Sequence, residues 1–172
     1  MGLFGNWFKG KPQPQDTRPA ASTLEYVKPP ERSIRYDPGL VASLKDDHSE
    51  LVAMYGQLGQ DVRDGHYQRI PNGLLAFKTR LEAHLLIENV RFYVYLEQAL
   101  THDSENMAII RDFRREMNGI ARGVVEFVRR YQQTRVTAAN AGDFMREYDE
   151  VGKLLVMRIE REEGNLYPLY AP

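Results

Sequence analysis

The sequence predicts an all-α fold, an up-down-up-down antiparallel four-helix bundle with an extended Pro-rich N-terminal tail. From residue 38 onwards, apolar residues recur at intervals of three and four, which is the spacing of one helix face. Segments in which apolar and polar residues alternate, as they do in strands, are lacking. The breaks between the helical segments are short, so consecutive helices should lie beside each other and antiparallel.

Residues 1–37 are predicted to form a tail and linker, and residues 38–172 the bundle. Most prolines of the chain fall between residues 10 and 38. Proline fixes its own backbone and disfavours helix in the residue before it, so this stretch is expected to be extended.

The first two helices are predicted over residues 38–63 and 71–100. Asp37-Pro38 is the expected start of the first, because an aspartate caps and a proline fits the first turn. Asp64-Gly65 is its expected end. The expected inward residues are Leu40, Leu44, Leu51, Tyr55 and Leu58, followed by Leu74, Phe77, Leu81, Leu85, Phe92 and Tyr95.

The third helix is predicted over residues 104–133, with caps from Asp103-Ser104. The fourth begins near Ala141 and stops before Pro168. The expected inward residues are Ile109, Phe113, Met117, Ile120, Val124 and Phe127, followed by Phe144, Tyr148, Val151, Leu155 and Ile159.

Two imidazoles and two carboxylates fall on these inward faces: His48, His84, Glu88 and Glu162. His84 and Glu88 are one helical turn apart, a spacing used by metal sites in bundles. A buried carboxylate is costly unless it is paired or coordinates a metal. This set of ligands suits iron, manganese or zinc, whereas the alternative is a metal-free polar network.

A sequence pattern is repeated around these carboxylates, in His84–Leu96 and Arg158–Tyr170. In both copies a glutamate comes four residues after the first position, and an apolar residue and a tyrosine follow four and five residues later. The repeat indicates that two helices each bring a carboxylate to one centre. One copy opens with a histidine and the other with Arg158, which can form a charge-assisted pair with Glu88 or Glu162.

Three motifs, LKDDHSEL, EAHLLIEN and IEREEGNLYP, resemble those of the hemerythrin-like, or HHE cation-binding, domain over roughly residues 38–170. The resemblance implies a four-helix bundle with a di-iron centre able to bind oxygen. It also implies that His48 and His84 serve one iron, and that Glu88 and Glu162 bridge both.

The ligands expected for the second iron are missing. Where the family usually has histidines on the third helix, this chain has Phe113 and Met117, and Arg158 replaces the histidine that opens the last motif. The metal site is therefore expected to be degenerate. Two interpretations remain open: a site for a single ion, or a metal-free core in which Arg158 supplies the positive charge of the lost iron.

The start of the tail has an amphipathic pattern. Leu3, Phe4, Trp7 and Phe8 share one face of a short helix, with Lys9 and Lys11 beside it. Such a segment can bind the inner face of a membrane peripherally, or dock into a groove of a partner protein.

Composition restricts the remaining function classes. The net charge of -1 gives no reason to expect nucleic-acid binding. The chain has no cysteine, which excludes thiolate sites. It also lacks a run of about 18 apolar residues and a secretory signal, so a cytoplasmic location is expected. No catalytic triad or phosphate-binding loop is found, so no enzyme activity is expected.

The sequence thus predicts a bacterial-type hemerythrin-like protein that binds iron or a similar metal and senses or buffers metal, oxygen or redox state. The alternative is a metal-free helical regulator or adaptor that acts by protein–protein binding.

Overall fold

The computed structural model describes residues 33–172, and this part of the chain contains helices and no strand. Its α-helices are α1 (Leu40–Arg63), α2 (Ile70–Ile87), α3 (Tyr93–Ala99), α4 (Ser104–Gln133) and α5 (Ala141–Arg161). Two π-helical segments, η2 (Glu88–Phe92) and η3 (Glu162–Leu166), and two 3-10 turns, η1 (Tyr67–Arg69) and η4 (Tyr167–Leu169), complete it. The tail residues Leu3, Phe4, Trp7 and Phe8 lie outside the described residues.

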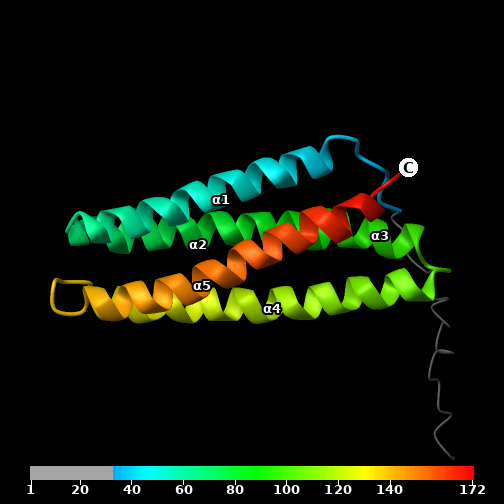
Figure 1. Ribbon diagram of the computed structural model, residues 1–172. Helices are drawn as coiled ribbons and strands as arrows, with labels where there is room; N and C mark the ends of the chain where they lie inside the picture. The colour runs from blue at the N-terminus through cyan, green and yellow to red at the C-terminus, as the bar shows by residue number, and fades with distance from the viewer. Residues whose placement is uncertain (1–32) are drawn as a thin grey trace, which may run out of the picture. The chain divides into compact units, whose positions relative to one another are not determined.

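The helices form an antiparallel four-helix bundle, as predicted (Figure 1). The segments α2, η2 and α3 follow one another without a break and make up the second helix of the bundle, and α5 continues into η3 in the same way. The chain therefore runs up and down four times, and its C-terminus lies beside the start of α1 (Figure 1). There, the Asp37 amide donates to the Tyr170 hydroxyl at 3.0 Å.

The helix ends follow the sequence closely. Gly65 has a φ of +74°, which ends α1 beyond Asp64, as expected. Asp103 accepts a hydrogen bond from the Asn106 amide at 3.0 Å and caps α4. The first helix begins at Leu40, two residues later than predicted, because the Asp37 carboxylate accepts from the Gly39 amide and forms a turn before the helix.

The core consists of two apolar clusters along the bundle axis. One cluster, near the turns that join α1 to α2 and α4 to α5, includes Leu51, Phe77, Leu81, Ile120 and Phe144. The other, near the termini, includes Leu44, Phe92, Phe113, Leu166 and Tyr170. On α1 and on the second helix, the predicted polar residues fall between the members of these two clusters, so they form a polar layer inside the bundle.

One predicted core position on α4 is wrong by a single residue. Ile109 is 37% exposed, whereas its neighbour Ile110 is fully buried. Ile109 and Ile110 lie four and three residues before Phe113, so both fit the spacing of a helix face. Only Ile110 continues the alternating intervals of three and four residues that keep the apolar side chains on one face of the helix. The phase of the stripe was therefore ambiguous at its end.

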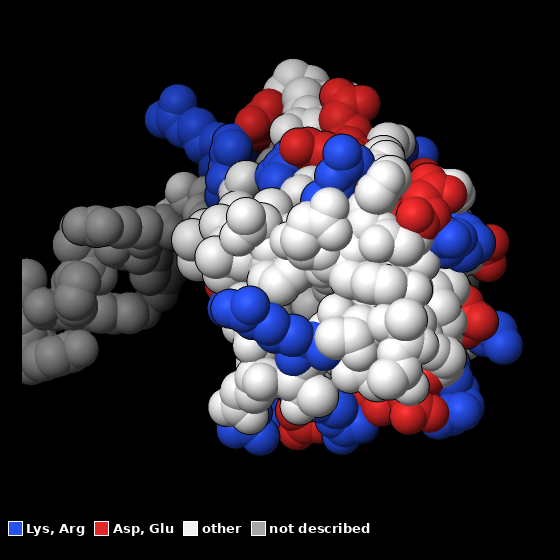
Figure 2. All heavy atoms as spheres, turned by 90° about the vertical axis from the view of Figure 1, so that its left-hand side faces the viewer, with Lys and Arg blue, Asp and Glu red and all other residues white. Residues whose placement is uncertain are grey.

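The end of the bundle where α4 gives way to α5 has a broad area without charged side chains (Figure 2). Lysine or arginine and acidic residues are interspersed around this area, so charges of one sign do not dominate this face. Within the described residues, no helix is long and apolar enough to cross a membrane.

Candidate metal centre

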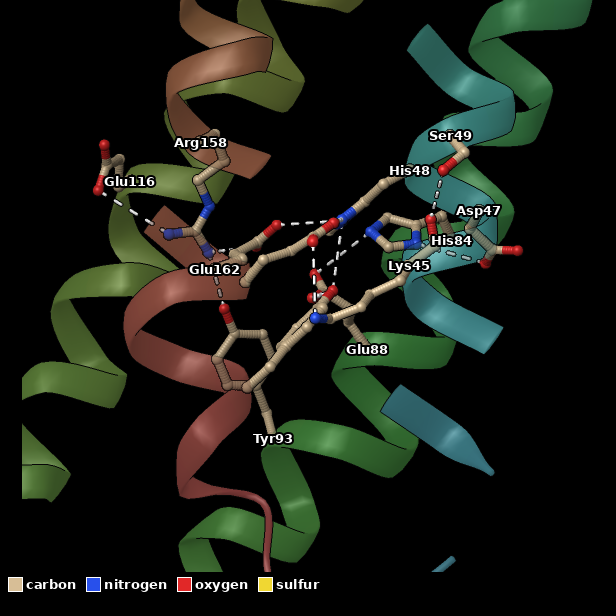
Figure 3. Close-up of polar contacts among 12 residues, drawn as sticks. Lys45, Asp47, His48, Ser49, His84, Glu88, Tyr93, Glu116, Arg158 and Glu162 are labelled. Atoms are coloured by element: carbon tan, nitrogen blue, oxygen red, sulfur yellow. Dashed lines mark hydrogen bonds and ion pairs between the residues drawn. The ribbon is translucent and has the colours of Figure 1, made fainter. Parts of the chain in front are cut away.

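The structure brings all five predicted site residues into the polar layer. His48 comes from α1, His84 and Glu88 from the second helix, and Arg158 and Glu162 from the last (Figure 3). Each of them is at most 3% exposed. The two other histidines of the chain, His66 and His102, lie in connections and take no part in the layer.

The ligand atoms converge on one point. His48 Nε2 lies 3.3 Å from Glu162 Oε2, and His84 Nε2 lies 3.8 Å from Glu88 Oε2. One ligand atom each from His48, His84 and Glu162 lie within 4.8 Å of one another. Two ligand atoms that each lie about 2.0–2.1 Å from an ion are at most about 4.2 Å apart. These three atoms would therefore need to approach one another only slightly to bind a metal.

Several buried polar atoms of this layer find no hydrogen-bond partner among the described residues. They include His84 Nε2, Glu88 Oε2 and Glu162 Oε2, whereas the other carboxylate oxygen of Glu162 is ion-paired with Arg158. An unsatisfied buried polar atom costs free energy, and native structures contain few of them. A cation at their meeting point would satisfy these atoms together, so the residues present fit a metal ion.

Two carboxylates orient the imidazoles. His48 Nδ1 lies 2.9 Å from Glu163 Oε1, and His84 Nδ1 lies 3.4 Å from Asp47 Oδ2. Asp47 is itself paired with Arg80. Metal-binding histidines are commonly held in this way through the nitrogen that does not face the metal. Asp47 and Glu163 were not predicted from the sequence, although each stands next to a predicted ligand in the chain.

A buried tyrosine was also missed. Tyr167 donates a hydrogen bond to Glu88 Oε1 at 3.0 Å, and its hydroxyl lies 3.2 Å from His48 Nε2. These distances resemble the separation of the His48 and Glu162 ligand atoms, so the phenol oxygen belongs to the same cluster. The repeated pattern pointed to it, since Tyr93 and Tyr167 occupy the same position in the two copies.

Arg158 occupies the other half of the layer. Its Nη2 atom lies 2.6 Å from Glu162 Oε1 and donates to the Tyr93 hydroxyl at 2.9 Å. The guanidinium stacks 4.5 Å above the Phe113 ring. On this side α4 contributes the buried apolar side chains of Phe113 and Met117, so a protein cation lies where ligands for a second ion are missing.

Both carboxylates stand at the start of a π-helical segment, Glu88 at that of η2 and Glu162 at that of η3. The repeated sequence pattern is therefore a repeated backbone distortion. π-Helical segments carry an extra residue per turn and are frequent at functional sites. Here each one keeps the glutamate and the tyrosine five residues later buried together.

Burial controls the charges of the layer. Burial, with the charge of Glu162, raises the pKa of Glu88 to about 8. Burial by itself would lower the pKa of His48, but the contacts with Glu162 and Glu163 outweigh it, and that pKa is raised. Burial and the neighbouring His48 lower the pKa of His84. At neutral pH His84 is therefore a neutral imidazole suited to a metal, while Glu88 holds a proton that a metal must displace.

Comparison with known families agrees with this arrangement. The model of the hemerythrin HHE cation-binding domain matches residues 39–170. The chain belongs to this family. The matched region contains the whole polar layer, and membership implies a metal cofactor, for which His48, His84 and Glu162 form a candidate site. No curated protein and no solved structure matches the chain significantly.

Proposed function

We propose that this HHE domain binds one metal ion, iron in the first place and manganese or zinc in the second, through His48, His84, Glu88 and Glu162. The observation that carries the proposal is the convergence of buried ligand atoms from three helices, several of which have no hydrogen-bond partner among the described residues. We further propose that the protein acts by binding rather than as an enzyme, and senses or buffers metal, oxygen or redox state. When bound, an iron ion would supply a change of oxidation state and open coordination positions.

The protein residues have distinct parts in this proposal. Glu163 and Asp47 direct the Nε2 atoms of His48 and His84 towards the centre. Tyr167 places a phenol oxygen at the same centre. An oxygen-rich set of this kind favours a hard ion, and a phenolate would favour the ferric over the ferrous state.

Arg158 supports a single ion rather than two. A second ion would lie close to a buried guanidinium and would be repelled by it, since charges interact strongly in a low-dielectric interior. It would also meet Phe113 and Met117, whose side chains do not bind iron well.

The test is the elemental analysis of protein purified from iron-fed cells. About one ion per chain is expected, with a loss of most of it in His84→Ala, since each ligand adds to the affinity. His102→Ala, which changes an exposed histidine, serves as the matched control. A content below about 0.2 ions per chain, unchanged in His84→Ala, would contradict the proposal.

A metal-free regulator or adaptor is the second candidate, and the ion pair of Arg158 with Glu162 favours it. A strong chelator distinguishes the two. A metal-binding protein loses melting temperature when the ion is removed, because a ligand of the native state stabilises it, whereas an adaptor of this kind does not respond.

We also propose that residues 1–10 attach this protein peripherally to the inner face of the cytoplasmic membrane, with a protein groove as the alternative. The apolar set Leu3, Phe4, Trp7 and Phe8 beside two lysines supports this proposal. Full-length protein should sediment with anionic vesicles at low salt, and protein starting at Asp37 should not. Equal sedimentation of the two would exclude the membrane.

A further inference from the structure

A cavity of about 550 Å³ opens between α1, α2 and α5 and ends at the polar layer. Its walls are mainly apolar and include Leu51, Val52, Tyr55, Phe77, Leu81, Leu155 and Val156. Its inner end is formed by His48, His84, Arg158 and Glu162, which are the residues of the candidate metal centre. The volume lies within the range of about 300–1,000 Å³ that is typical of sites for small organic molecules.

The cavity exists because α5 does not close fully on the bundle. The inward residues predicted for this helix beyond Phe144 are only half-buried. Around the cavity, Val52, Val156 and Met157 remain 48%, 46% and 42% exposed. On α1, a side chain added at Gly56 would find no atom within 4 Å of its Cβ, so the cavity is open there as well. Apolar side chains gathered around an open cavity are typical of a binding site.

The net charge at the inner end of the cavity favours the binding of an anion. Glu88 and Glu162 carry two negative charges when both bind a metal, and Arg158 carries one positive charge. With a divalent ion the buried layer has a net charge of about +1, which is costly unless it is compensated. Arg158 is only 1% exposed, and its Nε atom has no hydrogen-bond partner among the described residues, while its Nη1 atom makes a long ion-pair contact of 3.9 Å with Glu116 Oε2.

We propose that the cavity binds a medium-chain monocarboxylate, with the carboxylate at the polar layer and the hydrocarbon chain along the apolar walls. The anion compensates the charge of the metal-loaded layer, so the proposal rests on the proposed metal binding. The hydrocarbon chain of the ligand covers the apolar side chains that α5 leaves exposed. The HHE domain would then couple the state of its ion to the presence of a free fatty acid.

The experiment is calorimetric titration of the full-length, metal-loaded protein with hexanoate, octanoate and decanoate. Affinity should rise about fourfold for each added methylene until the cavity is filled, which is the free energy of burying one CH₂ group expressed as a ratio. Decanol, with the same chain and no charge, should bind at least about tenfold more weakly, because it cannot compensate the buried charge.

Gly56→Phe places a ring inside the cavity and should weaken decanoate binding at least about tenfold. Ala53→Phe adds the same ring to an exposed position of the same helix and should leave binding unchanged. Val52→Phe fills the rim from another position and replaces Gly56→Phe if that variant does not fold.

Metal content is measured in every sample, which separates the two proposals. A protein with about one ion per chain that does not bind decanoate would overturn the cavity ligand and leave the metal site intact. Equal binding of decanol and decanoate, or full binding by Gly56→Phe with its metal retained, would also overturn it. A protein that takes up no metal would refute the proposed function, and this inference with it.

Discussion

Arg158 is the residue that distinguishes this polar layer from a centre that binds two ions. Its guanidinium is 1% exposed and is held by Glu162, by the Tyr93 hydroxyl and by the Phe113 ring. A buried cation persists only when its surroundings compensate it, and here they do so with a carboxylate that also faces the metal side. The same glutamate therefore serves the arginine through one oxygen and the candidate ion through the other.

Arg158→His should change both metal content and stability. The imidazole adds a nitrogen ligand and, when neutral, removes a repulsive charge, so more metal per chain is expected. Without metal, the loss of the buried cation leaves Glu162 uncompensated, which typically costs about 3–5 kcal/mol at neutral pH. Elemental analysis and urea unfolding at neutral and acidic pH measure both effects, and acid should restore part of the stability as carboxylates protonate.

Arg161→His is the matched control for this change, because Arg161 lies on the same helix, is 43% exposed and pairs with Glu116. It should alter neither quantity by much, since exposed ion pairs contribute little. Unchanged metal content together with unchanged stability in Arg158→His would show that Arg158 does not occupy the layer.

Tyr167→Phe tests whether the phenol oxygen binds the ion. A phenolate bound to ferric iron absorbs visible light through charge transfer from the oxygen to the metal, so ferric protein should be coloured. The substitution should remove the colour while most of the iron stays, because four other ligands remain. Visible absorption and iron content are measured on the same samples, with Tyr93→Phe as the control that keeps the colour. Colour that persists in Tyr167→Phe would exclude this ligand.

The burial of the four candidate ligands in one layer could be predicted from sequence, because each lies at a core phase of a helix, where a polar or charged residue is unexpected. Asp47 and Tyr167 could not be found in this way. Asp47 lies beside the inward stripe of α1 and reaches the layer only through His84 on another helix. Tyr167 is inward only because a π-helical segment precedes it, and a phase counted at 3.6 residues per turn does not reveal this.

At the scale of the elements, the two π-helical segments shape the site. Each begins at a glutamate that contributes to the centre, and each ends just before a tyrosine of the layer. An extra residue in a helix weakens local hydrogen bonding, so its presence at both carboxylates indicates that the ligand geometry depends on it.

Deletion of Asn165, an exposed residue of η3, should convert this segment towards a regular α-helix. Helix content by circular dichroism should be retained, while metal content falls at least about threefold because Glu162 and Tyr167 lose their common orientation. Deletion of Ala138 in the exposed α4–α5 connection controls for shortening the chain. Equal metal content in both deletions would mean that the π-helical segment is not needed for the site.

The helices themselves were largely predictable from sequence, and the exceptions have physical causes. The spacing of apolar residues predicted the first and last residues of α1 and α4 to within two residues. The second helix was predicted as continuous, because its apolar pattern persists through η2. The half-burial of α5 was not predicted, because periodicity shows which face points inward but not whether the facing helix lies close enough to cover it.

At the scale of the whole molecule, a charged layer lies between two apolar clusters. These clusters contain nearly all of the buried apolar side chains and can hold the helices together, while the layer itself contributes unfavourable burial of charge. Without an ion, the fold reduces this cost by keeping Glu88 protonated, since burial and Glu162 raise its pKa. The stability of the metal-free protein should therefore depend on pH in a defined direction.

In the presence of a chelator, the free energy of unfolding should fall as pH rises from about 4.5 to about 8. In this range the folded protein keeps the Glu88 proton that the unfolded chain has lost, because the pKa is raised from 4.5 to about 8. The raised pKa of His48 acts in the same direction at pH values above 6.5, whereas the lowered pKa of His84 acts in the opposite direction below 6.5.

Glu88→Gln keeps the shape of the side chain and cannot ionise, so it should flatten much of this fall, and Glu82→Gln, at an exposed position on α2, should not. Urea unfolding from about pH 5 to about pH 9 measures the slopes of both variants and of the wild type. A bound ion should weaken or reverse the dependence, because it requires Glu88 without its proton. A slope that is the same in Glu88→Gln and in the wild type would show that Glu88 is not the proton-binding group of the metal-free layer.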